Sequence, residues 1–128
     1  MLKELGRLDE AEARYRQAIA LKPDYTEAYG NLGNTLQELG RLDEAEASYM
    51  QALALKPDYA EAYCNLGNAL QELGRLDEAE ARYLQALALQ PGHANTHSNM
   101  GNTLQELGRL EEAVASFTQA ITIKPNYA

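Results

Sequence analysis

Apolar and small residues follow a helical period along most of this chain, and the same arrangement returns at a fixed distance. Between residues 26 and 40 they are spaced so that they fall along one side of an α-helix. The members of this stripe are Tyr29, Leu32, Gly33, Leu36 and Leu39. A second stripe, between residues 43 and 56, contains Ala45, Tyr49, Ala52, Leu53 and Leu55. Each stripe predicts one amphipathic helix, so this stretch predicts a pair of helices.

The residues between the stripes predict where the helices begin and end. Asp24-Tyr25-Thr26-Glu27 has the form of a capping box, in which Asp accepts from a free backbone N–H and Glu reaches back to the cap. The same arrangement returns at Asp58-Tyr59-Ala60-Glu61. Gly40 suits the end of the first helix because glycine readily takes the left-handed conformation. Asp43 and Glu44 suit the start of the second helix, and Pro57 ends it because proline cannot continue the hydrogen-bond ladder.

The whole pattern repeats with a period of 34 residues. The Gly-Arg-Leu sequence begins at Gly6, Gly40, Gly74 and Gly108, and prolines stand at Pro23, Pro57, Pro91 and Pro125. This period predicts three complete units at residues 26–59, 60–93 and 94–127, with part of an earlier unit at 1–25. Residues 1–128 therefore predict a single all-α repeat domain.

Each unit presents an aromatic residue, a Leu-Gly pair, a large residue, and later Ala, a second aromatic residue and Pro. In the first unit these are Tyr29, Leu32, Gly33, Leu36, Ala45, Tyr49 and Pro57. The next units have Tyr63, Leu66, Gly67, Leu70, Ala79, Tyr83 and Pro91, then His97, Met100, Gly101, Leu104, Ala113, Phe117 and Pro125. This pattern resembles the tetratricopeptide repeat family. The resemblance implies a right-handed α-solenoid of antiparallel helix pairs, with the first helix of each pair on the concave side.

Small residues at fixed places predict how the two helices of a unit pack. Gly33 and Ala45 would let the helices approach closely, and Tyr49 would fill the space beside them. A glycine inside a helix costs about 1 kcal/mol relative to alanine, so its return in every unit indicates a packing requirement. His97 stands where the family often has Trp, and a histidine needs a polar partner when it is buried.

Amide side chains dominate the part of each first helix that lies outside the apolar stripe. They form two rows, the Asn31 row (Asn31, Asn65 and Asn99) and the Asn34 row (Asn34, Asn68 and Asn102), followed by Gln37, Gln71 and Gln105. Asparagine both donates and accepts hydrogen bonds, so these rows predict a groove that pairs with the backbone of an extended peptide. The rows resemble the asparagine-lined arm of O-linked N-acetylglucosamine transferase, which implies sequence-tolerant binding. The alternative is that the amides only bridge adjacent units.

Charge narrows the class of partner. The net charge is −8, which disfavours nucleic acid and anionic membranes as partners. Glutamates would rim the groove at Glu27, Glu61, Glu72 and Glu106, which favours neutral or basic protein ligands. No basic pair is expected to face the groove, unlike the chaperone-binding members that grip a terminal carboxylate. No apolar run approaches the roughly 18 residues of a membrane span, and no signal sequence is evident, so we expect a cytoplasmic protein.

Candidate chemistry is sparse. His93 and His97 have a metal-ligand spacing on a helix, but they stand where other units have tyrosine, so a packing role is the better prediction. Cys64 is the only cysteine and has no neighbouring base in the sequence to activate it. No phosphate loop or catalytic triad motif occurs. We therefore predict no enzyme, no catalytic residues, no metal and no cofactor.

The ends of the chain carry a further expectation. Met1–Leu5 would supply only the last turn of an opening helix, and Ala128 would open a further unit. Val114, Phe117, Ile121 and Ile123 would then be exposed, so the chain is expected to belong to a longer array or to stack end to end. Three functions stay open: a peptide or protein recognition module, a substrate-recruiting arm of a larger enzyme such as a glycosyltransferase, and a self-assembling scaffold.

Overall fold

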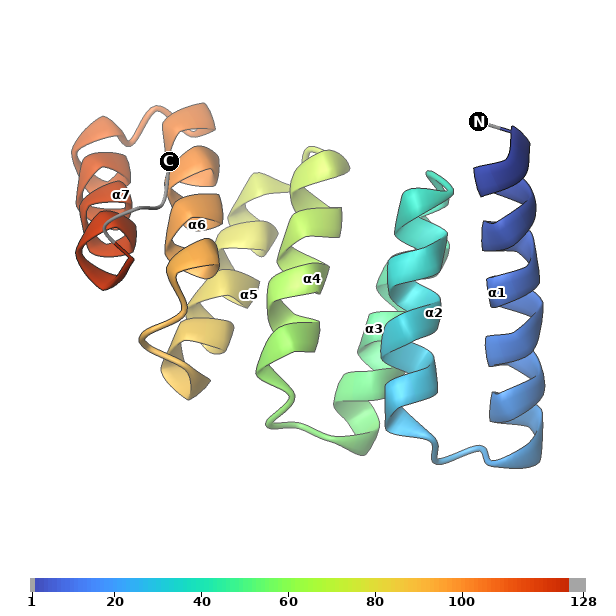
Figure 1. Ribbon diagram of the computed structural model, residues 1–128. Coiled ribbons are helices and arrows are strands. Elements are labelled where there is room, and N and C mark those ends of the chain that lie inside the picture. Colours follow the sequence, from blue (N-terminus) through green and yellow to red (C-terminus); the bar gives the residue numbers. More distant parts are fainter. Residues whose placement is uncertain (1, 125–128) are drawn as a thin grey trace.

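The computed structural model describes residues 2–124 as α-helices stacked side by side in chain order (Figure 1). Their bounds are α1 Leu2–Leu21, α2 Thr26–Glu38, α3 Leu42–Leu55, α4 Ala60–Glu72, α5 Leu76–Leu89, α6 Ala94–Glu106 and α7 Leu110–Ile123. Met1 and residues 125–128, which include Pro125 and the predicted start of a further unit, lie outside this range. None of the helices in the described range is both long and apolar enough to cross a membrane.

Each complete unit is one antiparallel pair, α2 with α3, α4 with α5 and α6 with α7 (Figure 1). The turn inside each pair is built on the predicted glycine, with φ of 78° at Gly40, 80° at Gly74 and 79° at Gly108. Gly40 N donates to Gln37 O at 3.0 Å, and Arg41 N donates to Leu36 O at 2.9 Å. These bonds satisfy carbonyl groups that the end of α2 would otherwise leave unpaired. The prediction of a left-handed glycine at this turn is confirmed.

The predicted capping boxes are wrong. Tyr25 and Tyr59 precede α2 and α4, and neither helix has a side-chain hydrogen bond at its cap. The reason is a backbone turn in which Tyr25 N donates to Lys22 O at 3.0 Å. This turn places Asp24 one residue too early to cap the helix. Only α6 has a side-chain cap among the helices whose caps are described, and there His93 accepts from Thr96 N.

The first helix is also longer than predicted. Residues up to Leu5 were expected to end a separate helix, but α1 continues without a break from Leu2 to Leu21. In the complete units, the left-handed glycine joins two helices that pack against each other.

Packing inside each pair depends on the glycine of the Leu-Gly or Met-Gly sequence. A Cβ atom at Gly33 would lie 2.6 Å from Tyr49 Cε1, and one at Gly67 would lie 2.6 Å from Tyr83 Cε1. Both tyrosines are fully buried. Because real Cβ atoms do not approach ring carbons this closely, only glycine lets the two helices meet at these places. The sequence prediction of a close approach filled by Tyr49 is confirmed.

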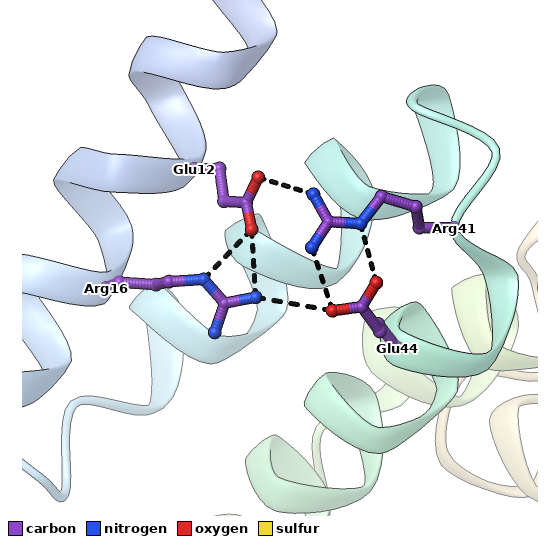
Figure 2. Close-up of polar contacts among 4 residues, drawn as sticks. All are labelled: Glu12, Arg16, Arg41 and Glu44. Atoms are coloured by element: carbon purple, nitrogen blue, oxygen red, sulfur yellow. Dashed lines mark hydrogen bonds and ion pairs between the residues drawn. The ribbon is translucent and has the colours of Figure 1, made fainter.

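Adjacent units are joined by an arginine that the sequence analysis did not single out. Arg41 Nη1 donates to Glu12 Oε1 at 2.6 Å, and Arg41 Nε donates to Glu44 Oε2 at 2.6 Å. Figure 2 shows that Arg16 completes this cluster between α1 and the start of α3. The neighbouring guanidinium of Arg41 lowers the pKa of Glu12. Equivalent clusters are formed by Arg75 with Glu46 and Glu78, and by Arg109 with Glu80 and Glu112.

Candidate functional site

The first helices of the units lie on the inside of the bend in the solenoid. Helix α4 contacts both α2 and α6, whereas no contact joins α3 to α5 within residues 2–124 (Figure 1). This spacing agrees with the concave side that the family resemblance implied. All nine predicted site residues lie on α2, α4 and α6.

The Asn34 row is bonded into the scaffold. Tyr49 OH donates to Asn34 Oδ1 at 2.5 Å, and Asn65 Nδ2 donates to the same oxygen at 3.1 Å. One asparagine thus connects both helices of its own unit to the first helix of the next. The same contacts recur one unit later among Asn68, Tyr83 and Asn99. For Asn34 and Asn68, therefore, the amide does bridge adjacent units.

The glutamines extend this bridging along the groove. Gln37 Oε1 lies 3.0 Å from Tyr49 OH, and Gln37 Nε2 donates to Glu72 Oε1 at 3.2 Å. Gln71 makes the equivalent contacts with Tyr83 and Glu106, and also accepts from Thr103 Oγ1 at 2.9 Å. Burial raises the pKa of both tyrosines, so their hydroxyl groups remain protonated donors. These contacts fix the spacing of neighbouring first helices.

The remaining predicted amides make fewer hydrogen bonds within the scaffold. Asn31, Asn102 and Gln105 are exposed, and Asn65 and Asn99 are half-buried. The contact to Asn34 occupies one N–H of Asn65, and a primary amide has a second N–H and a carbonyl oxygen to offer. Asn65 and Asn99 of the Asn31 row are held through one N–H each, whereas Asn34 and Asn68 each accept two hydrogen bonds through Oδ1.

Shallow recesses follow the concave side across the units. One recess of about 410 Å³ lies between α2 and α4 and includes Asn34, Asn65 and Asn68. An adjoining recess of about 400 Å³ lies between α4 and α6 and includes Gln71, Asn99 and Asn102. Both are bordered by Gln37, Asn68 and Glu72. We call this continuous polar surface the groove.

The connection between α3 and α4 also contributes to the concave side, which was not predicted from the sequence. Lys56 and Tyr59 share a recess with Asn31 and Glu61, and Lys56 Nζ lies 5.1 Å from the centre of the Tyr59 ring. This contact is a cation–π interaction, and it places one basic residue, rather than a basic pair, beside Asn31. The signal was present in the sequence, because residues just before a first helix lie next to the start of that helix.

The histidines and the cysteine have protein partners. His97 Nε2 donates to Pro91 O at 2.9 Å, which supplies the polar partner expected for a histidine at this position. His93 Nδ1 lies 2.7 Å from Thr96 Oγ1, and that hydroxyl also contacts Cys64 Sγ at 3.2 Å. Burial raises the pKa of Cys64, which keeps the thiol protonated. No group of three or more potential metal ligands gathers in the described part of the chain.

Family comparisons match nearly the full length. The tetratricopeptide repeat model matches residues 58–126, and a second TPR repeat model matches residues 1–40 and 33–74. The chain belongs to the tetratricopeptide repeat family. Comparison with the sequences of characterised proteins gave no significant match.

Solved structures of MamA have a similar fold. One, a crystal structure of MamA, is 26% identical with a TM-score of 0.91 over 98% of this chain and 73% of that chain. A second is 25% identical with a TM-score of 0.86 over 96% of this chain and 67% of that chain. A third, MamA MSR-1, is 27% identical with a TM-score of 0.82 over 98% and 72% of the two chains. Together with the family match, these likenesses define the chain as a protein–protein interaction or scaffold module.

Proposed function

We propose that the chain binds an extended peptide or partner segment along the groove, mainly through the Asn31 row. The observation that carries this proposal is the difference in hydrogen bonding between the two rows. The Asn34 row is engaged with Tyr49, Tyr83 and the next unit, and it orients Asn65 and Asn99 from behind. Amides oriented in advance lose less conformational entropy when a ligand binds.

The spacing of the units suits a peptide backbone. Packed helices lie roughly 8–10 Å apart, and an extended chain advances about 3.3 Å per residue. Each member of the Asn31 row would therefore meet about every third residue of the ligand. Because the contacts are to backbone groups, binding would tolerate many ligand sequences.

Removal of the Asn31 row tests the proposal. The triple variant Asn31→Ala/Asn65→Ala/Asn99→Ala should weaken the binding of peptides selected from a random library. At about 0.5–1.5 kcal/mol per hydrogen bond, the loss is about 1.5–4.5 kcal/mol, or roughly ten- to a thousandfold in affinity. Isothermal titration calorimetry measures the affinity, and thermal melting checks the fold. Unchanged affinity in the folded triple variant would contradict the proposal.

Asn34→Ala is the matched control within the same amide set. It removes an acceptor shared by Tyr49 and Asn65, so its main effect should be a lower melting temperature. A variant that loses peptide affinity but keeps full stability would show that the Asn34 row, rather than the Asn31 row, contacts the ligand.

The acidic rim should steer basic ligands. Glu27, Glu61, Glu72 and Glu106 are exposed on the first helices, and their attraction is screened over about 10 Å at roughly 0.1 M salt. Association of basic peptides should therefore be faster at low salt, as stopped-flow measurements would detect. A preference for acidic peptides that salt does not change would refute this part of the proposal.

A second candidate function is self-assembly through the outer face of α7. Leu110, Val114 and Ile121 are spaced four and seven residues apart, which places them in an apolar seam along one side of the helix, whereas the Phe117 ring packs against Gly101 of α6. Val114 is 63% exposed, and Leu110 and Ile121 are exposed as well, while Phe117 is half-buried. The other second helices have a glutamate at the Val114 position, where it pairs with the arginine of the next unit; these are Glu12, Glu46 and Glu80.

Sedimentation across a concentration series distinguishes this second candidate from peptide binding. If a second copy covers the α7 face, the average mass should rise with concentration, and Val114→Glu should restore the monomer because a charge would interrupt the apolar seam. Thr118→Glu, on the exposed surface of the same helix, controls for added charge. A monomer at every concentration would eliminate self-assembly through this face.

A further inference from the structure

The junction between α4 and α6 contains a recess that differs in charge from its counterpart between α2 and α4, which measures about 410 Å³ and is bordered by Lys56 and Tyr59. The recess measures about 340 Å³ and is bordered by Glu61, Asn65, Gln90, His93, Asn95 and Asn99. It opens onto the groove, because Asn65 and Asn99 belong to the Asn31 row. A ligand lying along that row would pass directly over its mouth.

The earlier recess is bordered by a tyrosine and a lysine. There the Tyr59 ring packs against α2 so closely that a Cβ atom at Gly30 would lie 3.2 Å from the Tyr59 hydroxyl oxygen. Lys56 contacts the same ring. One unit later the sequence has His93 in place of Tyr59 and Gln90 in place of Lys56. The ring is therefore smaller, and the positive charge is absent.

The His93 ring is also held toward its own helix. Its Nδ1 atom accepts from Thr96 N at 3.3 Å and lies 2.7 Å from Thr96 Oγ1. These contacts tie the imidazole to the first turn of α6. The imidazole therefore borders the recess from the side of α6.

The chemistry of the lining indicates a cationic occupant. Glu61 contributes an exposed carboxylate, and Asn65, Gln90 and Asn95 contribute amide groups that can accept hydrogen bonds. No lysine or arginine is among the residues that border this recess. A carboxylate surrounded by amide oxygens suits an ammonium or guanidinium group, which has several donors and no acceptor.

We propose that this recess is a specificity pocket that takes one lysine or arginine side chain of the peptide bound in the groove. This inference rests on the proposed peptide-binding function. Backbone pairing along the Asn31 row would set affinity for any extended chain, and the pocket would fix the register by requiring a basic residue opposite the α4–α6 junction. The earlier junction, with Lys56 and Tyr59 in place, would not share this preference.

Positional scanning of a random peptide library tests the pocket. The wild-type chain should enrich peptides with lysine or arginine at one position, and substitution of that residue by norleucine or citrulline should lower affinity. Glu61→Gln should reduce affinity for the selected basic peptide about five- to tenfold, the size expected for one partly exposed charged hydrogen bond. It should leave affinity for the norleucine or citrulline peptide unchanged.

Two further variants sharpen the test. Cys64→Gly/Gln90→Lys/His93→Tyr installs the residues of the earlier junction, where Gly30 leaves room for the Tyr59 hydroxyl, and should abolish the preference for a basic residue without unfolding the chain, which melting curves would verify. Glu10→Gln removes one negative charge from α1, outside the groove, and should change nothing. Peptides that bind with no preferred basic position, or with a preference that survives both pocket changes, would overturn the pocket and leave the peptide-binding function intact. Failure of all library peptides to bind would overturn both.

Discussion

Gly67 provides a sharp test of the packing inside a repeat. In Gly67→Ala, the new methyl group would lie 2.6, 2.8 and 3.0 Å from three atoms of the Tyr83 ring. That ring is fully buried, and its hydroxyl is held 2.6 Å from Asn68 Oδ1, so it cannot move aside without losing a hydrogen bond. Overpacking of this kind costs about 3 kcal/mol, at the upper end of its usual range. Alanine returns about 1 kcal/mol through its higher helix propensity, so the expected loss is about 2 kcal/mol.

Urea and thermal unfolding measure this loss, which corresponds to a fall of roughly 6–8 °C in melting temperature for a chain of this size. Two other glycines separate the contributions. Gly92→Ala has no heavy atom within 4 Å of the new methyl group and should be nearly neutral, whereas Gly74→Ala has the same open space but a φ of 80° and should be destabilising through backbone strain alone.

A double-variant cycle identifies the ring as the cause. In the background of Tyr83→Leu, which is itself destabilised, the space beside Gly67 is no longer occupied by an aromatic ring. There Gly67→Ala should become stabilising by about 1 kcal/mol, because only the helix propensity remains. If Gly67→Ala were as stable as the unmodified chain, or if its effect were equal in both backgrounds, the close approach would not be the reason for this glycine.

Two further predictions concern the polar contacts between helices. Tyr49→Phe should lower the free energy of unfolding in urea by about 0.5–1.5 kcal/mol because Asn34 loses a donor. Tyr59→Phe, on a half-buried ring, should lower it less. Equal losses in the two variants would contradict a stabilising role for the Tyr49 hydrogen bond. Lowering the pH should reduce the free energy of unfolding. Pairing with Arg109 lowers the pKa of Glu112 below its ordinary value of 4.5, so in acid the unfolded chain binds more protons than the folded chain. The stabilisation is complete above the unfolded pKa and is lost as the pH falls through the lowered pKa of the folded state; Arg109→Gln should flatten this part of the pH profile, and an unaltered profile would argue against the ion pairs.

The repeating pattern in the sequence was sufficient to predict the helix pairs, because the determinants of each pair lie within one 34-residue unit. Gly40 has to adopt a left-handed conformation to join two antiparallel helices, and Gly33 has to be small where Tyr49 crosses it. Both requirements are local and recur at the same place in every complete unit. The position of the amide rows on the first helices followed from the same period.

Details at the helix starts were not determined locally. The sequence of Asp24 and Glu27 matches a capping box, but the backbone turn after α1 moves the cap to Tyr25. Likewise, Gly6 has the same neighbours as Gly40 yet remains helical. A glycine with these neighbours therefore permits the left-handed turn but does not require it.

The roles of the polar side chains were decided only by the stacking of one unit on the next. Asn31 and Asn34 differ little in sequence context. Only Asn34, however, accepts hydrogen bonds from Tyr49 on the second helix and from Asn65 on the next unit. Arg41 reaches Glu12 across a separation of 29 residues for the same reason. Periodicity fixes the face of a helix on which a side chain lies, whereas a hydrogen bond also requires the distance and crossing angle between helices, and these exist only once neighbouring units have packed.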